Sequence, residues 1–277
     1  MKFGDEMRKE KLRDRDQLTG GYRDNYLSYR ARIGVLVPST NTAVEYDLQK
    51  VIPRGVTWHV ARFMINNADL SSDKSFVNFL DDLRETIGSS IESLLTCRPD
   101  HILMGMSAET FWGGVDGNDG FVDRVQQKIG SEIKMTTGAN SVAAALDAMN
   151  VSAHASKKLA IITPYQPIGD KNVRLFFEES GYEVGKIHGL RCENAHDAIA
   201  LVSEVEVANV IRAVDAGDID AIIQVGTNLS TSNVFPTFEK ILQKPMISIN
   251  TATIWHALRS CGVIDQFDNM GRLLEAH

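Results

Sequence analysis

Short runs of apolar and β-branched residues alternate with helical stretches over almost the whole chain after Arg32. The runs cover residues 32–38, 101–106, 133–138, 158–164, 182–189, 221–226 and 245–250. Helices are expected near 73–96, 119–130, 139–149, 170–181, 196–216, 233–243 and 251–261. Nearly continuous apolar strands separated by helices are typical of parallel sheets covered on both faces. The pattern therefore predicts an α/β fold.

The second half of the chain repeats the first. Three segments match in the same order: 32–38 with 158–164, 100–105 with 220–226 if one residue is inserted, and 135–146 with 247–258. Repeats of this length indicate a domain duplication. We expect two pseudo-symmetric α/β domains, each a parallel sheet flanked by helices, with a ligand site in the cleft between them. The predicted division is a charged N-terminal arm over 1–31, a first domain over 32–138 plus 245–277, and a second over 139–244.

Charge and composition exclude several classes of protein. The net charge of −7 argues against nucleic acid as the main partner, and no run of 18 apolar residues could span a membrane. The first residues contain no apolar core of a secretory signal, so we expect a cytoplasmic protein. The arm is interpreted either as a frayed end or as a segment lying over a partner subunit. Phosphate-binding glycine loops and HExxH are absent and His, Asp and Glu are scattered, so we expect no cofactor and no metal.

Polar, mostly uncharged side chains follow the carboxyl ends of the predicted strands. These are the positions where open parallel sheets bind ligands. They include Ser39, Thr40, Asn41, Ser107, Glu109, Tyr165, Thr227, Asn228 and Asn250. Several could equally serve as helix caps, which is the more common role of any single such residue. Because the loops recur at matching ends of both halves, we favour a site that binds a small carboxylate through hydrogen-bond donors and helix N-termini.

The same loops carry a family resemblance. The segments VPSTNTAVE, MGMSAETFWGG, ITPY and PMISINTATIWHALR resemble the aspartate/glutamate racemase superfamily, in its branch of maleate cis-trans isomerases and arylmalonate decarboxylases. The resemblance covers roughly Arg32 to Val263. It implies two pseudo-symmetric domains around one site, no cofactor, and a homo-oligomer, either dimer or tetramer. It further implies an isomerase or lyase that acts on a small carboxylic acid through an enediolate or carbanion.

The resemblance assigns roles to individual positions. Asn41 would contact a substrate carboxylate, Met106 and Ser107 would lie in the loop that holds an oxyanion, and Tyr165 would donate a hydrogen bond to the same anion. Thr227 and Asn228 would form the matching loop of the second half. Ser39, Thr40 and Asn250 complete the expected substrate-binding set. Such preorganised donors suit an oxygen that becomes negatively charged during the reaction.

The catalytic cysteines of the superfamily are missing. Their positions fall near Gly105–Met106 and at Gly226, whereas the cysteines of this chain are Cys97, Cys192 and Cys261. Proton transfer by a pair of thiols is therefore not supported. A remaining alternative is that Cys192 restores a thiol to the site.

Other groups could replace the thiols. Glu109 could act as a general base if burial raised its pKa, or it could form an ion pair with a neighbouring helix; the sequence leaves both open. Tyr165 suits a hydrogen-bond donor better than a base because of its high ordinary pKa, and Ser107 completes the expected catalytic set. The alternative to an enzyme is a non-catalytic protein that binds small carboxylates and retains only the cleft.

Overall fold

The computed structural model describes residues 27–151, 153 and 157–277, so residues 1–26 of the predicted arm lie outside the described part. The first half contains β1 (Ala31–Pro38), α2 (Ala43–Leu48), β2 (Val56–Phe63), α3 (Asp73–Leu95), β3 (His101–Met104), α4 (Ala108–Phe111), α5 (Gly114–Ile129), β4 (Lys134–Thr136) and α6 (Gly138–Ala148). The second contains β5 (Lys158–Thr163), α7 (Pro167–Glu179), β6 (Glu183–Gly189), α8 (Glu204–Val214), β7 (Ala221–Gln224), α9 (Phe235–Leu242), β8 (Met246–Ser248), α10 (Ile249–Ser260) and α11 (Arg272–Ala276).

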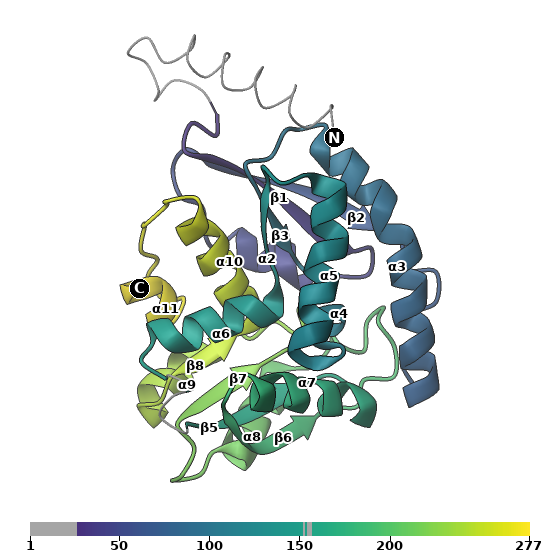
Figure 1. The fold of residues 1–277 in the computed structure, drawn as a ribbon. Coiled ribbons are helices and arrows are strands. Elements are labelled where there is room, and N and C mark those ends of the chain that lie inside the picture. Colours follow the sequence, from purple (N-terminus) through teal and green to yellow (C-terminus); the bar gives the residue numbers. More distant parts are fainter. Residues whose placement is uncertain (1–26, 152, 154–156) are drawn as a thin grey trace.

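Two parallel sheets with the same strand order form the framework (Figure 1). The first has the order β2-β1-β3-β4 and the second β6-β5-β7-β8. Within the described residues, every strand pair in both sheets is parallel, with helices as the connections. The α/β class and its duplicated topology are therefore as predicted.

Matching hydrogen bonds show how closely the halves correspond. Arg32 N donates to the Asp100 carboxylate at 2.9 Å, and Asp100 N donates to Arg32 O. Lys158 N donates to the Asp220 carboxylate at 2.8 Å, and Asp220 N donates to Lys158 O. The central strands also pair in the same register, so the two segments align without the inserted residue that the sequence comparison assumed. As a result Ser107 of the first half is the structural counterpart of Thr227.

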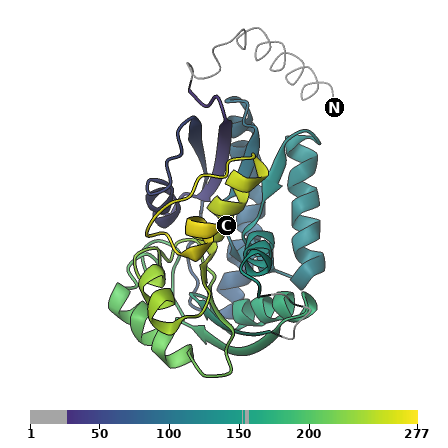
Figure 2. The same cartoon turned by 90° about the vertical axis from the view of Figure 1, so that its left-hand side faces the viewer.

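The helices that follow the last strand of each sheet cross between the halves. Helix α10 follows β8 of the second sheet but packs on β3 and β4 of the first, and α6 follows β4 but contacts β8. In Figure 2, where α10 and α11 face the viewer, the two halves lie one above the other with these helices at their junction. The predicted boundary at 244/245 falls just before β8, which belongs to the second sheet. The division into domains otherwise stays a prediction.

Two elements differ from the sequence-based expectation. Strand β2 was not among the predicted strands, because it lies at the sheet edge and only Val56 and Phe63 at its ends are buried. Helix α8 begins at Glu204 instead of near residue 196. The Asn194 side chain accepts from three following backbone N–H groups and forms a turn there. Ser203 then caps the helix by accepting from Glu206 N.

Each half has a dense apolar interior. The largest fully buried side chains include Phe63, Phe76, Phe111 and Phe177. Phe111 of α4 packs edge-on against Phe176 of α7 at 5.2 Å between ring centroids, so this aromatic cluster ties the first half to the second. Within the described ranges no helix is long and apolar enough to cross a membrane.

Candidate active site

A buried pair of hydroxyl groups joins the two halves at the carboxyl ends of their central strands. Ser107 follows β3, Tyr165 follows β5, and their side-chain oxygens lie 2.6 Å apart. Thr227, which follows β7, donates its backbone N–H to Ser107 Oγ at 3.2 Å. Ser107 is 3% and Tyr165 5% exposed, so water screens this hydrogen bond very little. The structure therefore brings together three of the predicted residues.

The backbone on both sides of Tyr165 is fixed by a second set of polar residues. Thr163 Oγ1 accepts from Tyr165 N at 3.2 Å and donates to the Asp170 carboxylate. Arg191 Nη1 donates to Asp170 Oδ2 at 2.5 Å and also to Tyr165 O. Asp170 and Arg191 were not predicted as site residues. Arg191 could have been found from its position just after β6, whereas nothing in the sequence distinguishes Asp170 from other helical carboxylates.

The Tyr165 side chain lies in apolar surroundings. The Phe76 ring meets it edge-on at 5.5 Å between centroids, and Trp112 packs against Phe76 at 5.9 Å. Burial raises the pKa of Tyr165 well above its ordinary value, more strongly than the hydrogen bond with Ser107 lowers it. The phenol therefore stays neutral at physiological pH and is available as a hydrogen-bond donor.

Two predicted carboxylate-binding residues, one from each half, both cap α2 of the first half. Asn41 Oδ1 accepts from Ala43 N and Val44 N at 3.1 and 3.0 Å, and Asn228 Oδ1 accepts from Thr42 N at 2.8 Å. The backbone N–H groups at the start of α2, expected to face an anion, are thus occupied by side-chain oxygens. Asn41 Nδ2 also donates to Thr227 Oγ1 at 3.2 Å, which makes these residues a bridge between the halves.

Asn250 and Asp47 hold the Thr227 loop from behind. Asn250 Nδ2 donates to Asp47 Oδ2 at 2.7 Å and to Thr227 O at 3.0 Å. Asp47 Oδ1 accepts from the hydroxyls of Ser230 and Ser232 at 2.9 and 2.7 Å. Asp47 is a buried carboxylate that sequence reasoning missed, since it lies in a short helix with no motif around it.

The other predicted substrate contacts engage the protein itself. Ser39 Oγ accepts from Ile65 N at 3.0 Å, and Thr40 O accepts from Asn228 Nδ2 at 3.3 Å. Met106 is 2% exposed, and its sulfur accepts from Glu109 N at 3.3 Å. Their binding roles remain predictions.

Glu109 forms ion pairs with two helices. Its carboxylate accepts from Arg84 Nε and Nη2 at 2.8 and 3.0 Å, and from Arg124 Nη2 at 3.0 Å. Arg84 belongs to α3 and Arg124 to α5, so Glu109 links α4 to both. Of the two interpretations left open by the sequence, the structure shows the ion pair. A carboxylate with both oxygens on guanidinium groups is poorly placed to accept a proton from a substrate.

The positions of the missing thiols have little space for a side chain. A Cβ on Gly105 would lie 2.6 Å from Val37 Cγ1, and one on Gly226 would lie 2.5 Å from Pro164 Cδ.

Burial raises the pKa of Cys192 to about 11, so this cysteine stays a thiol rather than a reactive thiolate. Among the described residues, no three His, Cys, Asp or Glu side chains are grouped as a metal site would require.

The fold and the site define a duplicated α/β protein whose strand-end loops meet at a buried polar junction. Residues 33–274 match the family model for arylmalonate decarboxylase. The chain therefore belongs to this family, within the branch of the aspartate/glutamate racemase-like superfamily that the sequence motifs predicted.

Individual relatives agree with this assignment over nearly their whole length. The chain is 22% identical over 248 residues to the maleate isomerase of Nocardia farcinica, covering 88% of this chain and 95% of the relative. A cysteine-to-serine variant of the Nocardia farcinica maleate cis-trans isomerase, solved with a covalently bound succinylcysteine intermediate, has a TM-score of 0.76 at 19% identity and covers 89% and 98% of the two chains. A crystal structure of arylmalonate decarboxylase has a TM-score of 0.67 at 18% identity, covering 88% and 98%. The protein is thus an enzyme of the isomerase or decarboxylase type.

Proposed function

We propose that the protein is a thiol-independent, cofactor-independent decarboxylase of small malonate-type carboxylic acids. The observation that carries this proposal is the buried convergence of Ser107 Oγ, Tyr165 OH and Thr227 N–H. The three groups come from loops of both halves and provide donors at one point. Such donors stabilise an oxygen that gains negative charge in the transition state.

The two hydroxyls bind the carboxylate that the substrate retains. In the structure one hydroxyl donates to the other. When a carboxylate oxygen enters beside them, both O–H groups can turn to donate to it. The Thr227 N–H bond to Ser107 Oγ polarises the serine and makes its O–H a stronger donor. The neutral Tyr165 phenol supplies the second bond without adding a negative charge.

Decarboxylation fits the absence of a base in contact with this pair. Within the described part of the chain, no carboxylate, thiol or imidazole hydrogen-bonds to either hydroxyl. When the C–C bond breaks, its electron pair stays on the α-carbon and is delocalised into the remaining carboxylate as an enediolate, and CO₂ leaves. No base has to remove a proton in this step. We assign the later delivery of a proton to the α-carbon to Tyr165, with replacement of that proton from solvent.

The surrounding side chains suit a substrate with an apolar substituent. Phe76 packs directly against the Tyr165 ring, and Trp112 in turn packs against Phe76. Maleate isomerisation is less well served, because it requires temporary addition to the double bond. The succinylcysteine of the Nocardia farcinica enzyme is such an adduct. In this chain the corresponding positions, near Gly105–Met106 and at Gly226, have no cysteine that could form one.

Turnover of defined substrates tests the proposal. The purified protein, dialysed against EDTA, is incubated with phenylmalonate, methylphenylmalonate and maleate, and products are followed by chromatography and CO₂ release. We expect CO₂ from a malonate, unaffected by complete alkylation of the cysteines with iodoacetamide. Conversion of maleate alone, or loss of activity in step with alkylation while the protein remains folded, would overturn it.

A further inference from the structure

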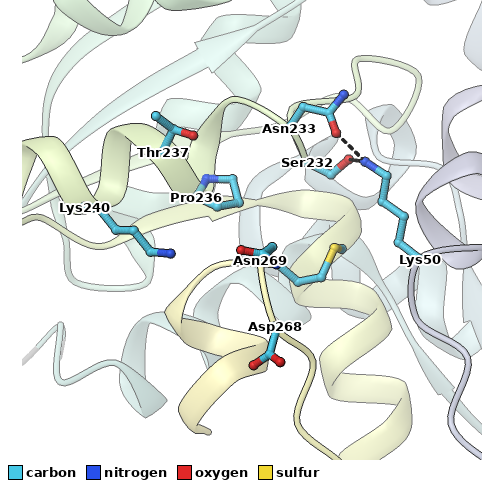
Figure 3. A pocket seen from close by; sticks show the side chains of 9 residues that line it. Lys50, Ser232, Asn233, Pro236, Thr237, Lys240, Asp268 and Asn269 are labelled. Carbon is cyan, nitrogen blue, oxygen red and sulfur yellow. Dashed lines mark hydrogen bonds between the residues drawn. The ribbon is translucent and has the colours of Figure 1, made fainter.

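A polar groove lies on the surface behind the Thr227 loop. Its volume is about 400 Å³, within the range of small-molecule sites. Three parts of the chain form it: the residues just after α2, the loop before α9 together with α9 itself, and the segment before α11. The lining residues are Lys50, Ser232, Asn233, Pro236, Thr237, Lys240, Asp268, Asn269 and Met270 (Figure 3).

Two ammonium groups from different halves of the chain line this groove. Lys50 Nζ donates to Ser232 Oγ at 2.7 Å and to Asn233 Oδ1 at 2.6 Å, both of which are neutral acceptors. The Lys240 ammonium has no hydrogen-bond or ion-pair partner within the described residues. Neither charge is therefore neutralised by a carboxylate, in a protein whose net charge is −7. Asp268, the one acidic residue of the lining, extends in Figure 3 away from Ser232 and Asn233.

Neutral donors and a helix terminus add to the positive character of the groove. The side chains of Thr237 and Asn269 have no partner in the part of the chain that the structure describes, and they border the same space as Lys240. Helix α9 begins beside them with no acidic residue in its first turn and no side-chain cap. Its N-terminal end therefore adds a partial positive charge on the side of the groove where Lys50 binds Ser232 and Asn233, whereas Lys240 projects from the last turn of the same helix.

We propose that this groove binds a small dianion, either inorganic phosphate or a short dicarboxylate. Figure 3 shows the side chains of Lys50 and Lys240 on opposite sides of the groove, so a dianion between them is attracted by both positive charges. The site is separate from the Ser107–Tyr165 pair. A chain of hydrogen bonds connects the groove to that pair. Ser232 accepts from Lys50 and donates to the Asp47 carboxylate. Asp47 accepts from Asn250 Nδ2, which also donates to Thr227 O.

Calorimetric titration with phosphate and with succinate tests the proposal. The titrations use the Ser107→Ala protein, so that binding at the candidate active site does not mask the groove, at a constant ionic strength set with chloride. We expect one of the two anions to bind, and the tighter one identifies the class of ligand. Lys240→Ala in the same background should weaken this binding at least 10-fold.

A matched variant controls for the loss of one positive charge. Lys171→Ala removes an exposed lysine from α7, outside the groove lining, and should leave the affinity unchanged. Lys240 is exposed and its ammonium has no partner in the described part, so its variant should fold, which circular dichroism verifies. The proposal is wrong if neither anion binds at millimolar concentration, or if the Lys240 and Lys171 variants lose affinity equally.

Discussion

The 2.6 Å hydrogen bond between Ser107 Oγ and Tyr165 OH joins the two halves of the protein at a point where neither half alone could form a site. Ser107 belongs to the first sheet and Tyr165 to the second. The Thr227 N–H reaches the same serine oxygen from a third strand end. The duplicated fold thus creates, by bringing strand ends together, a set of donors suited to an enediolate oxygen.

Removal of either hydroxyl should affect turnover far more than folding. We expect Ser107→Ala and Tyr165→Phe each to lower kcat by about 10²–10³-fold, the usual effect of losing one donor to an oxyanion. Steady-state kinetics on the accepted substrate measures this, with Ser89→Ala and Tyr29→Phe as controls of the same chemistry outside the site. A change in KM alone would show that the hydroxyls bind the ground state and the transition state equally.

Replacement of Glu109 should reveal a structural role. Glu109→Gln keeps the shape but removes the charge that pairs with Arg84 and Arg124. We expect a loss of about 1–3 kcal/mol in the free energy of unfolding, because the charge-assisted hydrogen bonds of a buried group are weakened. Urea denaturation measures the loss, and Glu92→Gln on the exposed face of α3 serves as control. A 100-fold fall in kcat with unchanged stability would instead restore Glu109 as the general base.

Asp170 should make stability fall as the pH rises. Burial raises the pKa of its carboxyl above the ordinary 3.8, outweighing the lowering by Thr163 and Arg191. Between pH 3.8 and the raised value, the folded protein holds a proton that the unfolded chain has released, so unfolding becomes easier with increasing pH. We expect the free energy of unfolding of Asp170→Asn to fall less than that of the wild type as the pH rises through this range. Denaturation from pH 3.5 to 7 measures the difference, and Asp123→Asn, an exposed carboxylate of α5, should follow the wild type.

His101 should have the opposite effect at mildly acidic pH. Burial, with a smaller contribution from His256, lowers the pKa of His101 from 6.5 to about 4, and its Nε2 has no hydrogen-bond partner among the described residues. Between these values the unfolded chain binds a proton that the folded protein excludes. Stability should therefore fall as the pH drops through this window, by at most about 1.4 kcal/mol per pH unit. His101→Leu should reduce this acid sensitivity, whereas His196→Gln at an exposed position should not; equal profiles for both variants would contradict the assignment.

The fold was largely predictable because burial on both faces leaves a strong pattern in the sequence. Strands such as β1 and β5 are continuous apolar runs, and their similarity to each other indicated the duplication. The edge strand β2 lacks that pattern, since most of its side chains are partly exposed. The crossing of α6 and α10 could not be predicted either, because it depends on contacts between residues far apart in the chain.

The candidate site was predictable only in part. Ser107, Tyr165 and Thr227 share a position relative to their strands, and this relation can be read from the sequence. Asp170 and Arg191 fix the backbone around Tyr165 through hydrogen bonds. The sequence pattern gives no sign of these contacts, because they depend on how the side chains lie in the folded protein. Whether Glu109 is a free base or an ion-pair partner depends on the positions of Arg84 and Arg124. Those positions are set by the packing of α3 and α5, which the sequence does not show.

Restoring the superfamily thiol at Gly226 should cost stability without adding thiol chemistry. Gly226 has a φ of +121°, a conformation that residues with a Cβ rarely adopt, and its added Cβ would lie 2.5 Å from Pro164 Cδ. We expect Gly226→Cys to lower the free energy of unfolding by about 1–3 kcal/mol through backbone strain and overpacking. Gly226→Ala separates the effect of the Cβ from that of the sulfur and should be destabilised to a similar extent. Thermal denaturation measures both variants, and titration with a thiol reagent reports whether the new cysteine is accessible. A Gly226→Cys protein as stable as the wild type, with new activity that alkylation abolishes, would show that the loop can accept the thiol and that its loss is not fixed by the local backbone.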